Sequence, residues 1–166
     1  MSARKRKRAV LVVDYQNMYR GAKDNEHDFH VIDLVLYVEK KYDLRREDVF
    51  VFMSQSFFGN MYEPARKKVE GIHARLKLPS RTRERNGFDP VDKAIIRLAK
   101  QQLRRKEIDA LVIASSDGDF APLGKEAWYR NKDYDIVCYD EPSWKLLVAA
   151  NNVVELKNQI NPHVRR

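Results

Sequence analysis

The chain of 166 residues fits one domain, long enough to bury about two-thirds of the surface that its unfolded form exposes. Hydrophobic residues make up 43% and charged residues 34%, and no apolar run approaches the roughly 18 to 20 residues that cross a bilayer, so the composition excludes a membrane-spanning protein and favours a cytoplasmic one. The formal net charge of +8 favours a polyanionic partner, and the single cysteine, Cys138, excludes an internal disulfide or a multi-cysteine zinc site.

Residues 1–8 form a basic arm whose last five residues are all Arg or Lys. Because the apolar residues after it stop at Asp14 and offer no small-residue cleavage site, the arm is not expected to be a secretory signal. Residues 9–14 are an apolar, valine-rich run and predict a buried first strand that ends in a carboxylate. Asn17 follows three residues later, in a short helix expected over residues 15–23.

The next segments alternate between helical and extended patterns. Apolar residues at helical spacing predict a helix over residues 30–42. Residues 48–58 are rich in β-branched and aromatic side chains and predict the second strand. Residues 61–76 predict another helix. Residues 78–87, with Pro, Asn and Gly among arginines, predict a mobile basic loop with room for a short edge strand.

Cations gather in this loop and just before it. The five expected to bind phosphates are Arg75, Lys77, Arg81, Arg83 and Arg85. Runs of Lys and Arg are often solvated faces, but these cations precede a helix that carries acids. Cations beside an acidic pocket suit a nuclease, because Arg and Lys bind the phosphates while the acids hold a metal ion.

A helix is expected from residue 88 to residue 103, with its apolar residues on one stripe. Its first turn carries two acids. Asp89 precedes Pro90 and is a candidate N-cap, and Asp92, three residues later, can support the exposed amides of the same turn. Both acids therefore have a capping interpretation as well as a functional one.

The stretch that organises the chain comes next. Residues 109–114 predict the central strand, which runs directly into Ser115, Ser116, Asp117, Gly118 and Asp119. In the plain alternative this is a solvated Asp-Gly turn, with Asp119 capping the helix that follows. In open α/β sheets, however, ligands bind outside the carboxyl ends of the strands, so acids placed there lie where a substrate is met.

The rest of the chain continues the alternation. It is expected to hold a helix over residues 120–130, a strand over 134–139, a short helix over 143–150 and an edge strand over 153–156. Trp128 and Trp144 lie in these helices among apolar neighbours and are expected in the core. Residues 157–166 form a polar C-terminal tail that is expected to fray.

Alternating strands and helices predict a single-domain, Rossmann-like α/β fold, a three-layer sandwich around a mainly parallel central sheet. The expected domain spans residues 9–156. Asp14 and Asp117 each follow a strand, and two carboxylates at one sheet edge repel each other unless a cation lies among them. The sequence therefore favours a cation site at the carboxyl edge of the sheet.

Together these residues resemble the NYN domain, a branch of the PIN-like ribonuclease superfamily. The resemblance rests on Asp14-x-x-Asn17, on Asp92 at a helix start and on the Ser115–Leu123 stretch, and it covers residues from about 9 to 140. Asp92 lies twenty-five residues before Asp117, which favours it as the family's third acid. Gly87-Phe88-Asp89 fits the local Gly-apolar-Asp pattern better, so Asp89 stays an alternative.

The resemblance implies a ribonuclease that uses Mg²⁺ or Mn²⁺, hard cations that prefer oxygen ligands. It implies Asp14, Asp92 and Asp117 as metal ligands, direct or through water. Asp119 is expected to complete this catalytic set or to cap the following helix. Asn17 is expected to orient Asp14 or a metal-bound water.

Ser115 and Ser116 have two interpretations, since they can donate to a phosphate oxygen or simply turn the chain. Two further functions also stay open. One is an RNA-binding or adaptor module on the same fold with weakened catalysis. The other is a phosphatase on a different Rossmann-like fold, but that class uses a second acid where this chain has Gln16. RNA, single-stranded or structured, is the expected partner, with no membrane, and the oligomeric state is open, a homodimer included.

Overall fold

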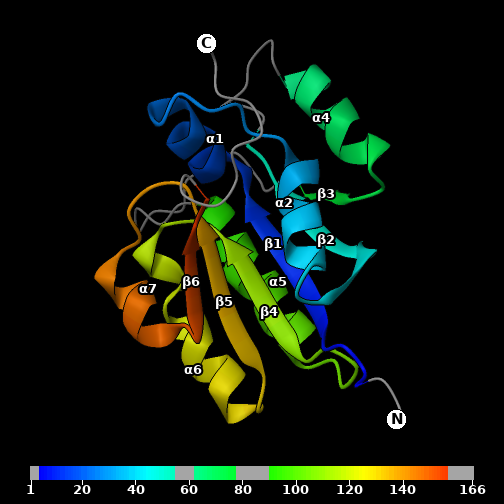
Figure 1. The fold of residues 1–166 in the computed structure, drawn as a ribbon, viewed down its shortest axis with the longest axis vertical. Coiled ribbons are helices and arrows are strands. Elements are labelled where there is room, and N and C mark those ends of the chain that lie inside the picture. Colours follow the sequence, from blue (N-terminus) through cyan, green and yellow to red (C-terminus); the bar gives the residue numbers. More distant parts are fainter. Residues whose placement is uncertain (1–3, 55–61, 78–89, 157–166) are drawn as a thin grey trace.

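The computed structural model describes residues 4–54, 62–77 and 90–156. The described residues form one six-stranded sheet in the order β3-β2-β1-β4-β5-β6, and every neighbouring pair is parallel (Figure 1). The strands are β1 (Arg8–Asp14), β2 (Asp43–Phe52), β3 (Arg75–Lys77), β4 (Ala110–Ala114), β5 (Asp133–Cys138) and β6 (Asn152–Glu155). The predicted α/β fold is confirmed, and the sheet is parallel throughout its described part.

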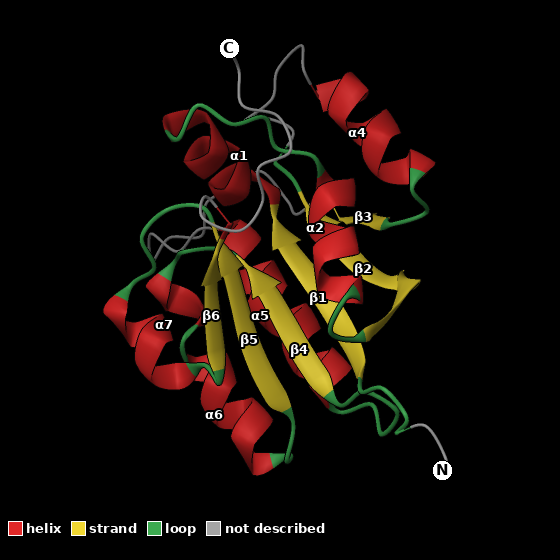
Figure 2. Ribbon diagram, viewed as in Figure 1, coloured by secondary structure: helices red, strands yellow, loops and turns green. Residues whose placement is uncertain are grey.

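Helices lie on both sides of the sheet (Figure 2). They are α1 (Tyr15–Asp24), α2 (Val31–Glu39), α4 (Tyr62–Gly71), α5 (Pro90–Leu103), the 3₁₀ helix η2 (Gly118–Phe120), α6 (Pro122–Tyr129) and α7 (Trp144–Ala149). Residues of α1, α2 and α4 belong to the core on one face, and residues of α5, η2, α6 and α7 belong to the core on the other. No helix in the described residues is long and apolar enough to cross a membrane.

Strand β1 lies inside the sheet, and its side chains pack into the cores on both faces. Leu11 and Val13 belong to one core, Val10 and Val12 to the other, and all four are fully buried. A parallel sheet covered on both faces uses such unbroken apolar runs. Burying each of these side chains contributes roughly 1.5–3 kcal/mol, which fixes the strand in place. The next residue, Asp14, is therefore held at the carboxyl edge of the sheet.

Strand β2 starts earlier than its pattern predicted. It begins at Asp43 rather than at residue 48, because Asp43 pairs with the first residue of β1. The pairing register shifts between Ala9 and Leu11, where β2 carries extra residues. The strand ends at Phe52, and the expected continuation over residues 55–58 lies outside the described residues.

The helix expected over residues 61–76 is divided into a helix and a strand. Helix α4 ends at Gly71, and His73 then adopts a left-handed φ of 62°, which cannot continue a helix. Arg75–Lys77 pair with β2 as the edge strand β3. The partner strand overrides the local helical pattern here. The basic loop expected over residues 78–87 lies outside the described residues.

Both tryptophans are on the surface, so the expectation that they are core residues is wrong. Trp128 on α6 is 72% exposed and Trp144 on α7 is 69% exposed. Helix α7 has six residues, and Leu146 is its one fully buried side chain among the described residues. A helix this short covers the sheet with a single anchor and leaves its other faces to solvent.

The opposite edge of the sheet, where the strands begin, is basic. The Asp48 carboxylate, 2% exposed, accepts from Arg8 Nη2 at 2.8 Å and from Arg105 Nη1 at 2.9 Å. A hollow of about 530 Å³ beside these residues is lined by Lys5 and Lys7 of the basic arm, among others. Because all strands run in one direction, this arm and Asp14 lie at opposite edges of the sheet.

Candidate active site

The carboxyl edge of the sheet gathers residues from two adjacent strands. Strands β1 and β4 are neighbours, and Val13 pairs with Ala114. The chain therefore leaves β1 through Asp14 and leaves β4 through Ser115 at the same height. Parallel pairing of these two strands is what brings together two acidic segments about a hundred residues apart in the sequence.

Asp14 is both a helix cap and a buried carboxylate. It is 6% exposed, and its Oδ1 accepts from the backbone N–H of Asn17 at 3.4 Å at the start of α1. Its Oδ2 accepts from the Ser115 hydroxyl at 3.3 Å. Ser115 is fully buried and also accepts from the Asp117 N–H at 3.2 Å. The Ser115 hydroxyl thus ties Asp14 to the loop after β4, which is a positioning role.

Asn17 joins the two strand ends through its side chain. Its Oδ1 accepts from the Ser116 N–H at 3.0 Å, and its Nδ2 donates to the Ser116 hydroxyl at 3.2 Å. We expected Asn17 to orient Asp14 or a metal-bound water. The side-chain amide holds the backbone and hydroxyl of Ser116, and the backbone N–H of Asn17 donates to Asp14 Oδ1. Asn17 therefore sets the position of the loop that carries Asp117.

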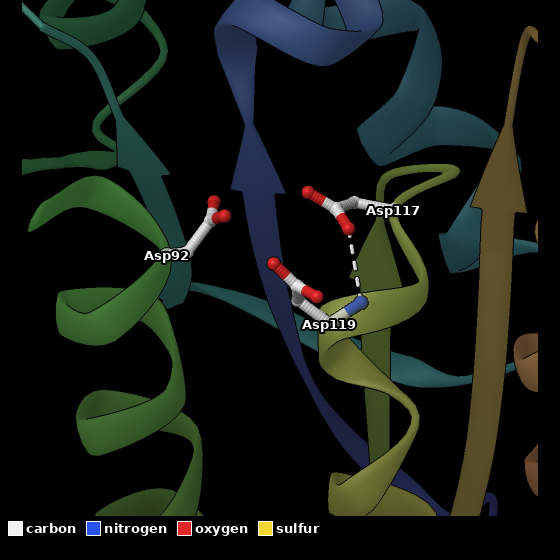
Figure 3. A group of neighbouring side chains, drawn as sticks. All are labelled: Asp92, Asp117 and Asp119. Atoms are coloured by element: carbon white, nitrogen blue, oxygen red, sulfur yellow. Dashed lines mark hydrogen bonds between the residues drawn. The ribbon is translucent and has the colours of Figure 1, made fainter. Parts of the chain in front are cut away.

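Three carboxylates converge in front of this loop. Asp117 Oδ1 accepts from the Asp119 N–H at 2.9 Å, which starts the 3₁₀ helix η2. Asp92 comes from the first turn of α5 and points toward both of them across β1 (Figure 3). One carboxylate oxygen from each of the three acids lies within 4.8 Å of the other two. We call Asp92, Asp117 and Asp119 the acid cluster.

Asp14 shares a hollow with two members of the acid cluster. The hollow has a volume of about 230 Å³, and its lining residues are Asp14, Gln16, Asn17, Arg20, Asp24, Val91, Asp92, Asp117 and Asp140. Asp24 and Asp140 were not among the expected site residues. Asp140 follows strand β5 just as Asp14 ends β1, so the strand-then-acid pattern was a usable signal. Asp24 ends helix α1, and nothing in its local sequence marks it.

The expected phosphate-binding residues are only partly placed. Arg75 and Lys77 lie on the edge strand β3, and both extend over the ring of Phe50, at 5.5 Å and 5.9 Å from its centroid. Cation–π contacts of this kind hold a long side chain in place and leave its charge available. The other three cations and the alternative third acid lie outside the described residues; they are Arg81, Arg83, Arg85 and Asp89.

Tyr15 follows Asp14 directly but is not equipped to act as a base. It is 8% exposed, and its ring stacks on Tyr19 with centroids 6.3 Å apart. Burial, with a smaller contribution from Tyr19, raises the pKa of Tyr15 to about 12. The phenol is therefore protonated at neutral pH and does not serve as a base there.

The family model described as NYN domain matches residues 8–157. The chain belongs to the NYN domain family. This confirms the resemblance to a branch of the PIN-like ribonuclease superfamily. A solved structure of a protein of unknown function from Vibrio parahaemolyticus is similar to this NYN domain, with a TM-score of 0.76 and 18% sequence identity over 94% of this chain and 96% of that one. At that identity the similarity shows a shared fold alone. No curated protein matched the chain.

The donor set of the NYN domain fits a hard divalent cation. The acid cluster offers carboxylate oxygens, and Asp14 adds another carboxylate to the same hollow. Mg²⁺ and Mn²⁺ prefer oxygen ligands and keep several waters, so a few carboxylates at one open edge suffice. Half-buried acids this close together repel one another, and a bound cation removes that repulsion. The residues present are therefore suited to the metal that the family uses.

A larger hollow lies away from the acid cluster, beside the end of α2 and strands β5 and β6. It has a volume of about 360 Å³ and mainly apolar walls. Its buried carboxylate, Asp135, accepts from Tyr42 Oη at 2.6 Å, from Lys41 Nζ at 2.8 Å and from Asn152 Nδ2 at 3.1 Å. Three donors already satisfy this acid, so size alone does not make the hollow a reactive site. The carboxyl edge of the sheet, with its acid cluster, therefore stays the candidate site of the NYN domain.

Proposed function

We propose that this NYN domain is a ribonuclease that hydrolyses phosphodiester bonds of RNA with the help of Mg²⁺ or Mn²⁺. The observation that carries the proposal is the acid cluster, whose carboxylate oxygens lie within 4.8 Å of one another at the carboxyl edge of the sheet. Acids at this edge of an open parallel sheet lie where substrates bind. Membership in the NYN domain family supports the same conclusion.

In this proposal the residues divide into ligands and supports. Asp14, Asp92 and Asp117 hold the metal, directly or through water, and Asp119 completes the set from η2. When bound, the metal supplies a water of lowered pKa and offsets the charge that develops on the phosphate. Asn17 acts through its hydrogen bonds to Ser116, which keep the loop after β4 against α1.

The proposal is tested by cleavage of single-stranded RNA. Cleavage is expected to require added Mg²⁺ or Mn²⁺ and to stop with a chelator. Asp92→Asn and Asp117→Asn should each lower the rate by on the order of 10²-fold or more. Asn17→Ala removes a support rather than a ligand and should cost about 10- to 100-fold. Asp43→Asn is a matched control, because Asp43 lies at the opposite edge of the sheet and its removal should leave the rate unchanged.

Equal cleavage by the parent and by both acid variants would contradict the proposal and point to a contaminating nuclease. RNA binding by the parent without metal-dependent cleavage would instead support the adaptor function. Cleavage and RNA binding are measured separately, so both can be determined on one preparation of each variant and the two outcomes can be distinguished.

The basic segment before α5 gives a second test, by salt dependence. Replacing Arg81, Arg83 and Arg85 together by Ala should flatten the slope of log affinity against log salt by up to roughly 2 units, at about 0.7 for each lost phosphate contact. Sequence preference should hardly change, because phosphate contacts position RNA without specifying it. A triple variant with the parent's affinity and salt slope would show that these three arginines do not contact the RNA, and would favour the basic arm at residues 4–8 as the RNA-binding segment.

A further inference from the structure

Helix α7 lies beside the loop that carries two members of the acid cluster. Ser143 caps this helix and donates its backbone N–H to Ser116 O at 3.2 Å. A Cβ added to Gly118 would lie 2.5 Å from Ser143 Oγ and 3.5 Å from Lys145 Cδ. Only glycine permits so close an approach, and it lies between Asp117 and Asp119. The first turn of α7 therefore borders the acid cluster.

This turn exposes a large aromatic side chain. Trp144 is 69% exposed, whereas Leu146, two residues later, is fully buried and anchors the helix. Leu147 and Val148 are 55% and 79% exposed and extend the apolar surface along α7. Single exposed apolar residues are ordinary, whereas contiguous exposed apolar patches are typical of binding surfaces. Trp144, in the turn of α7 that borders the acid cluster, is thus suited to a ligand with a flat apolar part.

The charge around Trp144 favours nucleic acid as that ligand. Lys145 is exposed and adjoins Trp144, and its side chain passes close to Gly118. The chain as a whole carries a net charge of +8. An aromatic ring paired with a cation is the arrangement that binds single strands, because the ring stacks on a base and the cation neutralises a phosphate. Bases within a duplex are stacked on one another and are not open to such a ring.

We propose that Trp144 stacks on a base of single-stranded RNA beside the acid cluster, while Lys145 contacts a neighbouring phosphate. The inference rests on the proposed function for its choice of RNA as the ligand. Helix α7 is then a platform that holds the nucleotide next to the phosphate at the acids. It gives the NYN domain a preference for unpaired RNA, which carboxylates and a metal cannot provide.

Tryptophan fluorescence can report on this contact directly, because the chain contains two Trp residues. Trp128→Phe isolates the emission of Trp144, and Trp144→Phe isolates that of Trp128. Both are made in an Asp92→Asn background, so that a single-stranded RNA of about ten nucleotides is not consumed. Added RNA should quench the emission of Trp144. It should leave Trp128 unchanged, since Trp128 lies near the end of α6, away from the loop where that helix begins.

Affinity measurements in the same background give the size of the effect. Trp144→Ala, and Trp144→Leu as a second variant that stays apolar, should weaken binding by about 5- to 150-fold. Trp144→Phe should retain most of the affinity, and Trp128→Ala, matched in exposure at 72%, should retain all of it. An abasic oligonucleotide of equal charge should bind the parent and Trp144→Ala alike. Lys145→Gln should flatten the salt slope by about 0.7.

The inference would be overturned if Trp144→Ala bound RNA with the same affinity as the parent, or if Trp128→Ala lost as much RNA affinity as Trp144→Ala. Self-association that is lost in Trp144→Ala without any change in RNA affinity would show that a second copy covers α7, which also overturns it. Cleavage assays keep the two proposals apart. Metal-dependent cleavage with no role for Trp144 contradicts only the stacking, whereas Trp144-dependent binding without cleavage contradicts only the nuclease.

Discussion

Neutralising one member of the acid cluster should stabilise the metal-free protein. Asp92→Asn keeps the shape of the side chain and removes one of the carboxylates that lie within 4.8 Å of one another. At that separation two unit charges repel by about 3.5 kcal/mol for an effective dielectric constant of 20 and by about 0.9 kcal/mol in bulk water. Asp92 and Asp117 are half-buried, so the relief lies between these limits.

A helix effect opposes this gain. Asp92 is in the first turn of α5, where a negative charge stabilises the helix by roughly 0.3–1 kcal/mol. The net gain expected is therefore about 1–2 kcal/mol, and for a chain of this length that corresponds to a rise in melting temperature of roughly 2–8 °C. The gain should shrink in 1 M salt, where the Debye length is about 3 Å and shorter than the separation of the charges.

The assay is thermal unfolding with and without Mn²⁺ or Mg²⁺. A metal concentration of 100 times Kd should stabilise the parent by about 2.7 kcal/mol. Asp92→Asn should respond less, because one ligand has been removed. Asp43→Asn, at the other edge of the sheet, should show the parent's full response and no gain without metal. The reasoning is refuted if Asp92→Asn melts at or below the parent in metal-free buffer, or if metal shifts both proteins equally.

Three other expectations concern stability away from metal binding. Asp48→Asn removes the buried carboxylate that Arg8 and Arg105 contact, and should lower the free energy of unfolding in urea by about 3–5 kcal/mol. A change near zero would show that the buried ion pairs contribute little to stability. Gly124→Ala places a Cβ 2.4 Å from Ala149 O and should cost about 1–3 kcal/mol, whereas Gly71→Ala, with no atom within 4 Å of its Cβ, should not; equal effects would contradict the close approach. For Tyr15 the raised pKa means that its stabilisation is present below pH 10 and is lost as the pH rises to about 12. The parent should therefore lose about 3 kcal/mol more over that range than Tyr15→Phe, and parallel curves of stability against pH would refute the shift.

The local patterns of the sequence were sufficient for the architecture. Unbroken apolar runs predicted strands buried on both faces, and β1, β4 and β5 lie within a residue or so of their expected positions. The acids that end β1 and follow β4 were visible as strand-then-carboxylate patterns, and a parallel sheet has to bring such residues to one edge. Burial shows in the apolar pattern of each segment, and the alternation of strands and helices along the chain favours parallel strands, so both can be inferred before any contact is known.

Other features depended on which segments meet, and no local pattern encodes that. Arg75–Lys77 became strand β3 because β2 offered an edge to pair with, although the segment continued a helical pattern. Trp144 looks apolar among apolar neighbours, but α7 is too short to bury more than Leu146 fully, so the ring faces solvent.

The acidic edge itself shows both contributions. The sequence alone determined that Asp14, Asp92 and Asp117 begin or end elements where acids can act. The tertiary structure decided that β1 pairs with β4, that the Asn17 side chain hydrogen-bonds to Ser116, and that Asp140, which follows β5, lines the same hollow as Asp14. Strand order is set by packing of the two cores as a whole, a sum over many distant side chains, and the distances among these carboxylates follow from that sum.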